Sequence, residues 1–401
     1  MKSLNFKDKK VLVRVDFNVP LNEDGEVTDD TRIRRALPTI NYILDRGGSV
    51  ILMSHLGRPL SKLNEDGTIN KSAFSLLNLK EHLNELLDNK VFFAEDCGGE
   101  ESRKKAGALE PGQVLLLENT RFNKGEKQGD DAFAKKLADL ADIFINDAFG
   151  AAHRAHASTT TIAKFFDKEH KAFGLLMQSE LENGQKVLLE PKAPFVAIVG
   201  GAKVSDKIPL VRNLLDSTND ICIGGGMAYT FLAARGYEVG DSLVEQDKIE
   251  MASEILELAM ERSTKIHLPM DSVIAEEFSP KANFKVTENT NIQSGWMGLD
   301  IGPKTISYFT DVILKAKTIV WNGPMGVFEF DACNKGTFAI AQAVAGATEE
   351  GAFSLVGGGD SVSAINKSGL SAKVSFVSTG GGAMLELLEG KTLPGVAAIT
   401  E

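Results

Sequence analysis

This sequence of 401 residues contains little cysteine and has no basic excess, and each shortage excludes a class of proteins. The three cysteines, Cys97, Cys222 and Cys333, are an odd number at wide spacing, which suits neither a disulfide framework nor a zinc knuckle. We therefore expect reduced thiols in the core. The net charge of -11 argues against a general affinity for nucleic acid or anionic membranes, so any anion-binding site must be local.

Long apolar segments are missing as well. No stretch approaches the roughly 18 apolar residues of a membrane span, and the first residues, MKSLNFKDKK, lack the apolar core of a signal peptide. These features predict a cytoplasmic protein that does not act at a membrane. No repeat with a period of about 20 to 50 residues and no low-complexity tract occurs, which sets solenoids and disordered tails aside.

Two common nucleotide-binding signatures are also absent. No glycines have the G-x-G-x-x-G spacing of the dinucleotide fingerprint. The G-K-[ST] sequence at Gly390 has Leu385 where a Walker loop requires glycine, and it follows an apolar helical segment instead of preceding one. A classical dehydrogenase and a P-loop kinase are both disfavoured.

What the sequence does contain is an alternation of short apolar runs, rich in β-branched residues, with amphipathic segments. This rhythm is typical of parallel α/β sheets. The runs fall into two groups, which begin at Val11, Ser49, Val91, Gln113 and Asp142 and at Phe195, Asp220, Lys265, Thr318, Phe353 and Val374. Two sheets are implied, and the chain is long enough for two domains of ordinary size.

A different pattern separates the two groups of runs. From Lys171 onward, leucines and charged residues recur at helical spacing, and Pro191 and Pro194 follow where a helix should stop. We therefore expect an N-terminal domain over residues 1–170, a linking helix over 171–190 and a C-terminal domain over 191–389.

The ends of the predicted strands are rich in arginine in the first half of the chain. In open α/β sheets, ligands bind at the carboxyl ends of the strands. The polar residues near those ends are Arg14, Asp16, Asn18, Arg32, Arg34, His55, Arg58, Arg121, His153, Arg154 and His156. A guanidinium group offers two parallel donors to phosphate or carboxylate, so the cluster predicts a compact, doubly anionic ligand.

A simpler explanation exists for each of these residues taken alone. A single arginine is more often solvated or part of a structural salt bridge, but several at the strand ends of one sheet make that explanation weak. The histidines are weaker evidence, because a lone histidine is usually a core or surface group. Only His55 is favoured, since Arg58 is its near neighbour.

In the second half of the chain the strand ends carry glycine. The turns VGGAKVSDK, IGGGMAY, VGGGDS and STGGGA each lie between an apolar run and a helix-like segment. Such turns let the backbone approach a phosphate, which free N–H groups at a helix N-terminus can bind. One glycine cluster is often only a tight turn, but several in one half favour a nucleotide site. Lys203 and Lys207, four residues apart on one helical face, would neutralise phosphate oxygens, and Asp360 would bind magnesium.

Taken together, a series of motifs that runs in order through nearly the whole chain resembles the phosphoglycerate kinase family. The motifs are RVDFNVP from Arg14, TRIRRALPT from Thr31, SHLGRP from Ser54, ENTRF from Glu118, AHRAHAS from Ala152, GGAKVSDK from Gly200, GGGMA from Gly224, WNGPMGVFE from Trp321, GGGDS from Gly357 and STGGGA from Ser378. The resemblance implies two Rossmann-like lobes, each a parallel sheet flanked by helices, joined by a hinge helix, with residues 390–401 returning to the N-terminal lobe. It also implies a phosphotransferase that moves a phosphoryl group reversibly from 1,3-bisphosphoglycerate to ADP, giving 3-phosphoglycerate and ATP in glycolysis and gluconeogenesis.

The resemblance further implies which residues bind each substrate. The phosphoglycerate would lie against Asp16, Asn18, Arg32, His55, Leu56, Gly57, Arg58, Arg121 and Arg154. Adenine and ribose would lie near Gly201, Ala202, Gly225, Gly298, Leu299, Pro324, Val327 and Glu329. The phosphates would lie near Lys203, Lys207, Gly358, Gly359, Asp360, Ser361 and the turn from Gly380 to Gly382. Ser361 departs from the threonine that is also common in the family but keeps a hydroxyl, and DACNKGT after Phe330 is locally unusual.

The expected chemistry requires no general base, because the attacking carboxylate or phosphate is already ionised at neutral pH. Catalysis would then consist of alignment and charge stabilisation by Arg32, Lys203 and the N–H groups of Gly381 and Gly382, with Mg²⁺ bridging the ADP or ATP phosphates and Asp360. We also expect a monomer that closes about its linking helix. The alternatives are an NAD-dependent dehydrogenase, which lacks its glycine fingerprint here, and a non-catalytic anion-binding protein, which would carry a secretory signal.

Overall fold

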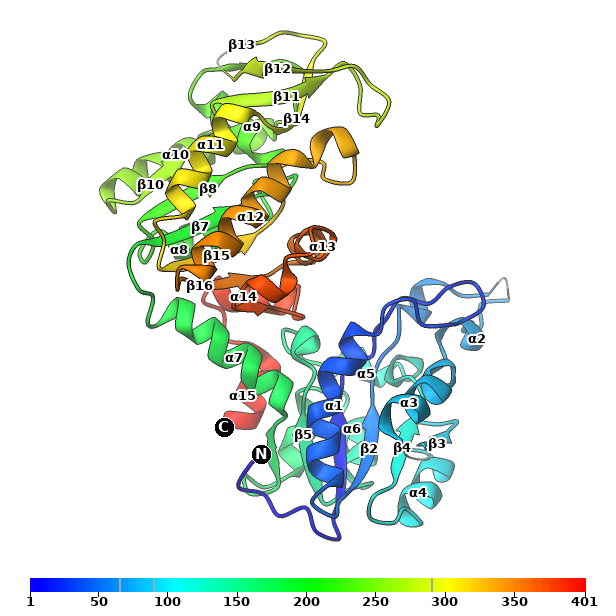
Figure 1. The fold of residues 1–401 in the computed structure, drawn as a ribbon. Helices are drawn as coiled ribbons and strands as arrows, with labels where there is room; N and C mark the ends of the chain where they lie inside the picture. The colour runs from blue at the N-terminus through cyan, green and yellow to red at the C-terminus, as the bar shows by residue number, and fades with distance from the viewer. Residues whose placement is uncertain (65, 89–90, 290) are drawn as a thin grey trace. The chain divides into compact units, whose positions relative to one another are not determined.

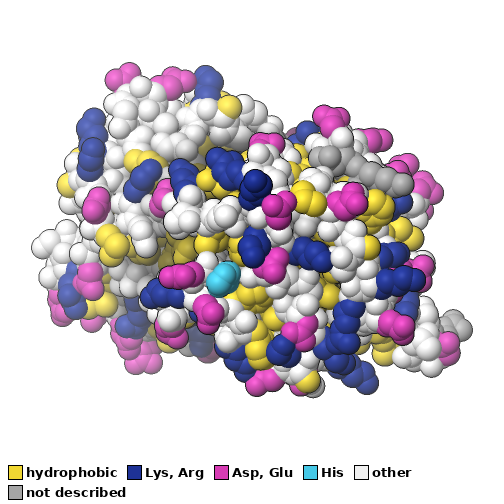
Figure 2. Space-filling view, turned by 90° about the horizontal axis from the view of Figure 1, so that it is seen from below, with side chains coloured by type: hydrophobic (Ala, Val, Ile, Leu, Met, Phe, Trp, Pro, Cys, Tyr) yellow, Lys and Arg dark blue, Asp and Glu magenta, His cyan; other side chains and the backbone are white. Residues whose placement is uncertain are grey.

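The computed structural model describes residues 1–64, 66–88, 91–289 and 291–401 and divides into two compact units. The N-terminal unit comprises Met1–Leu181 and Thr392–Glu401, and the C-terminal unit comprises Glu182–Lys391. In the described parts of the chain, no helix is both long and apolar enough to cross a membrane. The face displayed in Figure 2 carries acidic and basic side chains interspersed with one another.

The N-terminal unit is built on a six-stranded parallel sheet with the strand order β3-β4-β2-β1-β5-β6 (Figure 1). Its strands are β1 (Lys10–Arg14), β2 (Ser49–Met53), β3 (Val91–Ala94), β4 (Val114–Leu117), β5 (Ile143–Asn146) and β6 (Lys171–Phe173). Strands β1 to β5 each begin within one residue of an apolar run of the first group, which confirms that part of the expected fold.

The linking helix expected over residues 171–190 is shorter in the structure. Residues 171–173 extend the sheet instead, because they pair in parallel with Phe144, Ile145 and Asn146 of β5. Helix α7 begins only after this strand and spans Leu175–Leu188. The leucine spacing therefore predicted the helix, but it did not reveal the edge strand in front of it.

Helices cover both faces of this sheet, because successive strand residues point to opposite sides. Val11 and Val13 pack with residues of α1 and α3, whereas Leu12 packs with residues of α4, α6 and α15. The helices of the unit are α1 (Thr31–Leu44), α2 (Lys71–Phe74), α3 (Lys80–Leu87), α4 (Glu100–Gly107), α5 (Gly125–Gln128), α6 (Asp131–Ala138) and α15 (Pro394–Thr400). With both faces covered, the carboxyl edge of the sheet is the natural place for a ligand.

The C-terminal helix α15 is fixed to the N-terminal unit by backbone contacts. The Gly395 N–H donates to the Ala152 carbonyl at 2.8 Å, and Asn146 Nδ2 donates to the Gly395 carbonyl at 3.2 Å. Lys171 Nζ donates to the Ala398 carbonyl at 2.8 Å. These bonds hold the end of the chain against the segment that leads to Arg154.

The C-terminal unit contains a second six-stranded parallel sheet, with the order β10-β8-β7-β15-β16-β17. Its strands are β7 (Phe195–Val199), β8 (Asp220–Ile223), β10 (Lys265–His267), β15 (Thr318–Asn322), β16 (Phe353–Val356) and β17 (Phe376–Val377). The helices are α8 (Ile208–Leu214), α9 (Met227–Ala234), α10 (Ile249–Glu261), α11 (Pro303–Ile313), α12 (Lys335–Glu349), α13 (Gly359–Lys367) and α14 (Gly382–Leu388). All runs of the second group form strands of this sheet, and α11 and α12 pack on one of its faces (Figure 1).

Two small sheets of this unit were not expected. Strands β12 (Phe284–Glu288), β11 (Asp271–Ala275) and β14 (Met297–Ile301) form an antiparallel sheet, and β9 (Glu238–Val239) pairs with β13 (Asn291–Ile292). The first small sheet escapes a search for apolar runs because β12 is largely exposed and β14 contains Gly298 and Asp300.

The cysteines only partly match the expectation of core thiols. All three are free, and Cys222 and Cys333 are buried. Cys97 is partly exposed because it lies in the turn between β3 and α4 rather than within an element.

Candidate active site

Several of the predicted arginines converge at the carboxyl edge of the N-terminal sheet. Arg14 ends β1 and is fully buried, and Arg121 is almost fully buried in the turn after β4. The arginines lie close enough to His55 to affect its ionisation. Burial lowers the pKa of His55 well below its usual value, and it is lowered further by the positive charges of Arg14, Arg121, Arg32 and Arg154. The strand ends therefore create one local positive field in a protein of negative net charge.

Arg32 lies in the first turn of α1 and is held by residues that follow β1. Its Nη1 atom donates to Asp16 Oδ2 at 3.1 Å and to the Asn18 carbonyl at 3.2 Å. Asn18 Oδ1 in turn accepts a hydrogen bond from the Gly57 N–H at 2.7 Å. The Arg32 side chain keeps 38% of its surface exposed, so a positioned guanidinium group remains accessible to a ligand.

The turn after β2 is held by residues that follow β4. Asn119 Nδ2 donates to the Leu56 carbonyl at 2.8 Å, and Arg121 Nη1 donates to the Gly57 carbonyl at 2.6 Å. Burial lowers the pKa of Arg121 to about 10, with further lowering by Arg154 and Arg14. Within the described chain, the buried Arg121 Nε has no hydrogen-bond partner, which leaves a donor for an anion.

The remaining basic residues of the prediction divide between the cluster and the surface. Arg154 Nε donates to His153 Nε2 at 3.0 Å, and burial with the charges of Arg121, Arg14 and Arg154 lowers the pKa of His156 to about 4. Arg58 is exposed in the turn that follows His55. Arg34 lies outside the cluster because it forms an ion pair with Asp30, four residues earlier on the exposed side of α1.

The C-terminal unit contains a cavity of about 490 Å³ where the turns after β7, β8 and β15 meet β14. The turns are joined by backbone bonds: the Gly201 N–H donates to the Pro324 carbonyl at 3.1 Å, and the Gly225 N–H donates to the Met325 carbonyl at 2.9 Å. Gly225 has a φ of 68°, and a Cβ atom there would lie 2.6 Å from the Gly201 backbone. The glycine cluster thus permits the close approach of turns that shapes the cavity.

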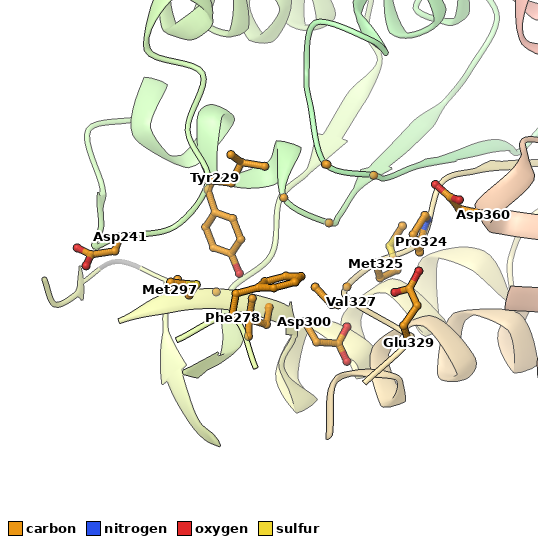
Figure 3. A pocket seen from close by; sticks show the side chains of 18 residues that line it. Tyr229, Asp241, Phe278, Met297, Asp300, Pro324, Met325, Val327, Glu329 and Asp360 are labelled. Carbon is orange, nitrogen blue, oxygen red and sulfur yellow. The ribbon is translucent and has the colours of Figure 1, made fainter. Parts of the chain in front are cut away.

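All eight residues predicted to contact adenine and ribose line this cavity. They are Gly201, Ala202, Gly225, Gly298, Leu299, Pro324, Val327 and Glu329, and Asp360 joins them. Glu329 and Asp360 lie toward one end of the cavity and Asp241 toward the other (Figure 3). The middle of the cavity is therefore lined mainly by apolar side chains and glycine backbone, with exposed carboxylates toward its two ends and the buried Asp300 in its wall.

Several wall residues were missed by sequence reasoning. Tyr229 comes from α9, Met297 from β14, and Phe278, with 64% of its surface exposed, from the loop after β11 (Figure 3). Tyr229 Oη lies 2.7 Å from Ser272 Oγ and packs on Gly298, where a Cβ atom would come within 1.8 Å of Oη. Gly298 is therefore explained by Tyr229, which ends the IGGGMAY segment but was given no role in the sequence analysis.

The lysines of the first glycine turn do not share a helical face as expected. Helix α8 begins only at Ile208, with Pro209 in its first turn, so Lys203 and Lys207 lie in the turn before it. Lys207 Nζ donates to Asn322 Oδ1 at 2.6 Å, whereas Lys203 is exposed. Glu245 holds the turn, because its carboxylate accepts the Ser205 N–H at 2.9 Å and the Ser205 hydroxyl at 2.6 Å.

The glycine turns after β16 and β17 lead directly into helices. Gly358 and Gly359 open α13, which carries Asp360 in its first turn, and Gly381 and Gly382 open α14. Ser361 is fully buried, and its Oγ accepts the Gly323 N–H at 2.5 Å. That hydroxyl therefore stabilises the turn after β15.

The acidic groups fit a cation that is held mainly by a ligand. Over the described ranges, no three His, Cys, Asp or Glu side chains are grouped to hold a metal ion. Asp360 supplies a single exposed carboxylate at the cavity. Mg²⁺ is commonly bound by one or two carboxylates together with substrate phosphates, so this donor set suits it.

Asp300 is a buried carboxylate in the wall of the cavity. Its Oδ2 accepts the Gly336 N–H at 2.7 Å and its Oδ1 accepts the Ile301 N–H at 2.9 Å. Burial raises the pKa of Asp300 to about 7, although both N–H donors lower it. The carboxylate links β14 to the N-terminus of α12, and it changes charge near neutral pH.

This pKa predicts that Asp300 makes the protein less stable as the pH rises. In the unfolded chain the group ionises near its ordinary value, whereas in the folded protein it holds its proton up to about pH 7. The free energy of unfolding therefore falls as the pH rises from the unfolded pKa to the folded pKa of Asp300. The fall between about pH 5.5 and about pH 8 is about 2 kcal/mol. Chemical denaturation should show a smaller loss over this interval for Asp300→Asn; an unchanged loss would contradict the raised pKa. Burial also raises the pKa of Asp147 to about 7. Because Asp147 is present in both the native protein and Asp300→Asn, its contribution cancels in the comparison.

Comparison with known proteins extends these observations to the whole chain. The model of the family described as Phosphoglycerate kinase matches residues 1–391. The phosphoglycerate kinase of Moorella thermoacetica is 52% identical over 401 residues, covering 100% of this chain and 98% of that protein. The cytosolic phosphoglycerate kinase of Triticum aestivum is 51% identical over 397 residues, covering 99% and 96%.

A solved structure agrees with the sequence matches. The phosphoglycerate kinase of Coxiella burnetii superposes with a TM-score of 0.88 at 42% identity, covering 100% of this chain and 98% of the other. The sequence identity extends over essentially the full length and the fold is the same. These two findings exclude the alternative functions considered above, an NAD-dependent dehydrogenase and a non-catalytic anion-binding protein. The chain belongs to the phosphoglycerate kinase family.

Proposed function

We propose that the arginine cluster of the N-terminal unit binds 3-phosphoglycerate or 1,3-bisphosphoglycerate, and that the cavity of the C-terminal unit binds ADP or ATP. The chain is a phosphotransferase of glycolysis that transfers a phosphoryl group between these substrates with a carboxyl group as acceptor. One observation carries the assignment of sites: a buried arginine cluster lies in one unit and a cavity walled by glycine turns lies in the other. Arginine forks suit a small acid with carboxylate and phosphate groups. A cavity of about 490 Å³ is within the usual range for a ligand of nucleotide size.

In the proposed substrate site, arginine side chains would supply most of the hydrogen-bond donors to the ligand. Arg32, Arg121 and Arg154 would neutralise the phosphate and carboxylate groups, and Arg58 would reach the ligand from the exposed turn. Asp16 and Asn18 would act partly by holding Arg32, which both already contact. The backbone of Leu56 and Gly57 would shape the site, because their carbonyls are already used by Asn119 and Arg121.

In the nucleotide site, the apolar middle of the cavity would hold adenine and Glu329 would accept the ribose hydroxyls. Lys203, Lys207 and the turns around Gly358, Gly359, Asp360 and Ser361 would receive the phosphates. Mg²⁺ bound to Asp360 and the nucleotide would neutralise the charge of the phosphate oxygens.

The reaction needs alignment and positive charge rather than a base. A carboxylate ionises near pH 4, so the attacking group is already an anion at neutral pH. We assign the stabilisation of the transferred group to Arg32, Lys203 and the N–H groups of Gly381 and Gly382. Arg32 is already positioned by Asp16 and Asn18, so little reorganisation is required of it.

Because the two proposed sites belong to different units, we expect transfer to require closure of the two units around both substrates. Closure would also exclude water, which otherwise hydrolyses the acyl phosphate. Residues of α7 would provide the hinge. We expect small-angle scattering to give a smaller radius of gyration with both substrates than with either alone; identical radii would contradict closure.

We further propose that the protein acts as a cytoplasmic monomer. Each proposed site is built from residues of one chain, so no second copy is needed to complete it. The cytosolic relative in wheat supports this location.

The test of function is turnover of ATP with 3-phosphoglycerate and Mg²⁺, coupled to glyceraldehyde-phosphate dehydrogenase so that NADH is consumed. We expect activity that EDTA abolishes and excess Mg²⁺ restores. If the folded protein is inactive with 3-phosphoglycerate while the coupling enzyme works, the substrate assignment is wrong. If the activity survives EDTA, the proposed role of Mg²⁺ is wrong.

A further inference from the structure

A buried chain of polar groups lies behind the proposed substrate site. Glu126 is fully buried, and its Oε1 accepts the Ser158 hydroxyl at 2.6 Å while its Oε2 accepts the Ser158 N–H at 3.1 Å. The Ser158 Oγ in turn accepts from Arg14 Nε at 2.8 Å. Ser158 and Arg14 are also fully buried. The Ser158 hydroxyl thus joins the guanidinium group of Arg14 to the carboxylate of Glu126, and hydrogen bonds to charged groups are strong in a buried environment.

The chain ends on the ring of His55. Arg14 Nη2 lies 3.1 Å from His55 Nδ1, and Arg14 Nη1 bonds to the Val15 carbonyl. A guanidinium nitrogen can only donate, so His55 Nδ1 must accept and cannot carry a proton. The nearest carboxylate oxygen, Asp16 Oδ1, is 4.0 Å from Nδ1, which is beyond hydrogen-bond distance.

The surroundings of His55 favour a neutral ring. The side chain is almost fully buried, and the guanidinium groups of Arg14, Arg121, Arg32 and Arg154 act on it from different elements. Asp16 is the acidic group near it. A neutral histidine whose Nδ1 is unprotonated carries its proton on Nε2, and among the described residues Nε2 has no hydrogen-bond partner.

We propose that Glu126, Ser158 and Arg14 are positioning residues that fix His55 as its Nε2–H tautomer, so that the ring presents a hydrogen-bond donor to the bound phosphoglycerate. The first part concerns the protein alone, and the second rests on the proposed substrate site. A fixed donor matters because the free imidazole would otherwise divide between two tautomers, of which one presents an acceptor to an anion.

The tautomer can be observed directly by long-range ¹H–¹⁵N correlation spectra of uniformly ¹⁵N-labelled protein, with the His55 signals assigned by their loss in His55→Asn. We expect the native protein to show the neutral Nε2–H pattern at pH 7. The Nδ1–H pattern, or that of a charged ring, would overturn the proposal. This measurement needs no activity and no destabilising variant.

Ser158→Ala removes the link between Glu126 and Arg14. We expect a mixture of His55 tautomers and a KM for 3-phosphoglycerate that rises about threefold to tenfold, with the KM for ATP unchanged. The matched control is Ser102→Ala, which removes an equally buried serine hydroxyl from α4 of the same unit and should leave the His55 signals native. A native tautomer in Ser158→Ala would overturn the relay.

The outcomes also separate the two levels of the proposal. Addition of 3-phosphoglycerate to the native protein should shift the His55 Nε2 signal. If the tautomer is as proposed but the ligand leaves His55 unperturbed, the substrate site is wrong and the relay stands. If the ligand perturbs His55 but the ring is the other tautomer, the relay is wrong and the substrate site stands.

Discussion

Replacement of Arg32 by alanine should lower kcat by about 10³-fold or more while the affinity for the nucleotide changes little. The reason is the placement of this residue. It is the one arginine proposed both to bind the acid and to stabilise the phosphoryl group in flight, and it is held in place by Asp16 and Asn18 before any ligand arrives. Because the charge on the transferred group develops only in the transition state and Arg32 is not assigned to the nucleotide site, its loss should affect turnover far more than nucleotide affinity.

The chain supplies a matched control for this experiment. Arg34 is two residues away on the same helix, but it is exposed and paired with Asp30, so Arg34→Ala should retain turnover. Steady-state kinetics with both substrates, together with nucleotide titrations, would separate the effects. Small and equal changes in kcat and affinity for Arg32→Ala would reduce Arg32 to a binding residue.

The parts of the molecule that the sequence predicted well are those encoded by short local patterns. Each apolar run of the two groups became a parallel strand, because a strand buried on both faces must be apolar along its length. Arg121 could be predicted to join the arginine cluster and Gly225 to line the cavity because both lie in the turns that follow those strands. Parallel strands end at one edge, so sequence neighbours of strand ends become spatial neighbours.

The residues that sequence reasoning missed act through tertiary contacts. Tyr229 and Phe278 line the cavity of the C-terminal unit, but Tyr229 lies inside helix α9 rather than in the turn after β8, and Phe278 belongs to a loop beside the unexpected antiparallel sheet. Glu126 lies in a short surface-like sequence, GEKQ, that gives no sign of burial. Its role depends on Ser158, 32 residues later, and no local period encodes such a pair.

The turn before α8, which carries Lys203 and Lys207, was wrongly predicted to be helical, and this error changes the roles predicted for the two lysines. A shared helical face would make Lys203 and Lys207 equivalent, whereas the structure distinguishes them. Lys207 is partly buried, burial lowers its pKa, and its amine is already bound to Asn322. Lys203 is exposed and makes no hydrogen bond or ion pair with the described residues, while Glu245 holds the backbone of the turn that carries it.

Lys203→Met should therefore lower kcat by about 10²- to 10³-fold, because it removes a positive charge that is free to follow the transferred phosphoryl group. Lys207→Met should instead raise the KM for the nucleotide and lower kcat much less, because that amine is fixed at the wall of the site before the reaction begins. The two variants remove the same charge from the same turn, so each controls for the other in net charge and in size. Measurement of kcat and KM for both substrates distinguishes the roles. Equal losses of kcat in the two variants would show that the turn binds phosphate as a unit, and the separate role given to Lys203 would have to be abandoned.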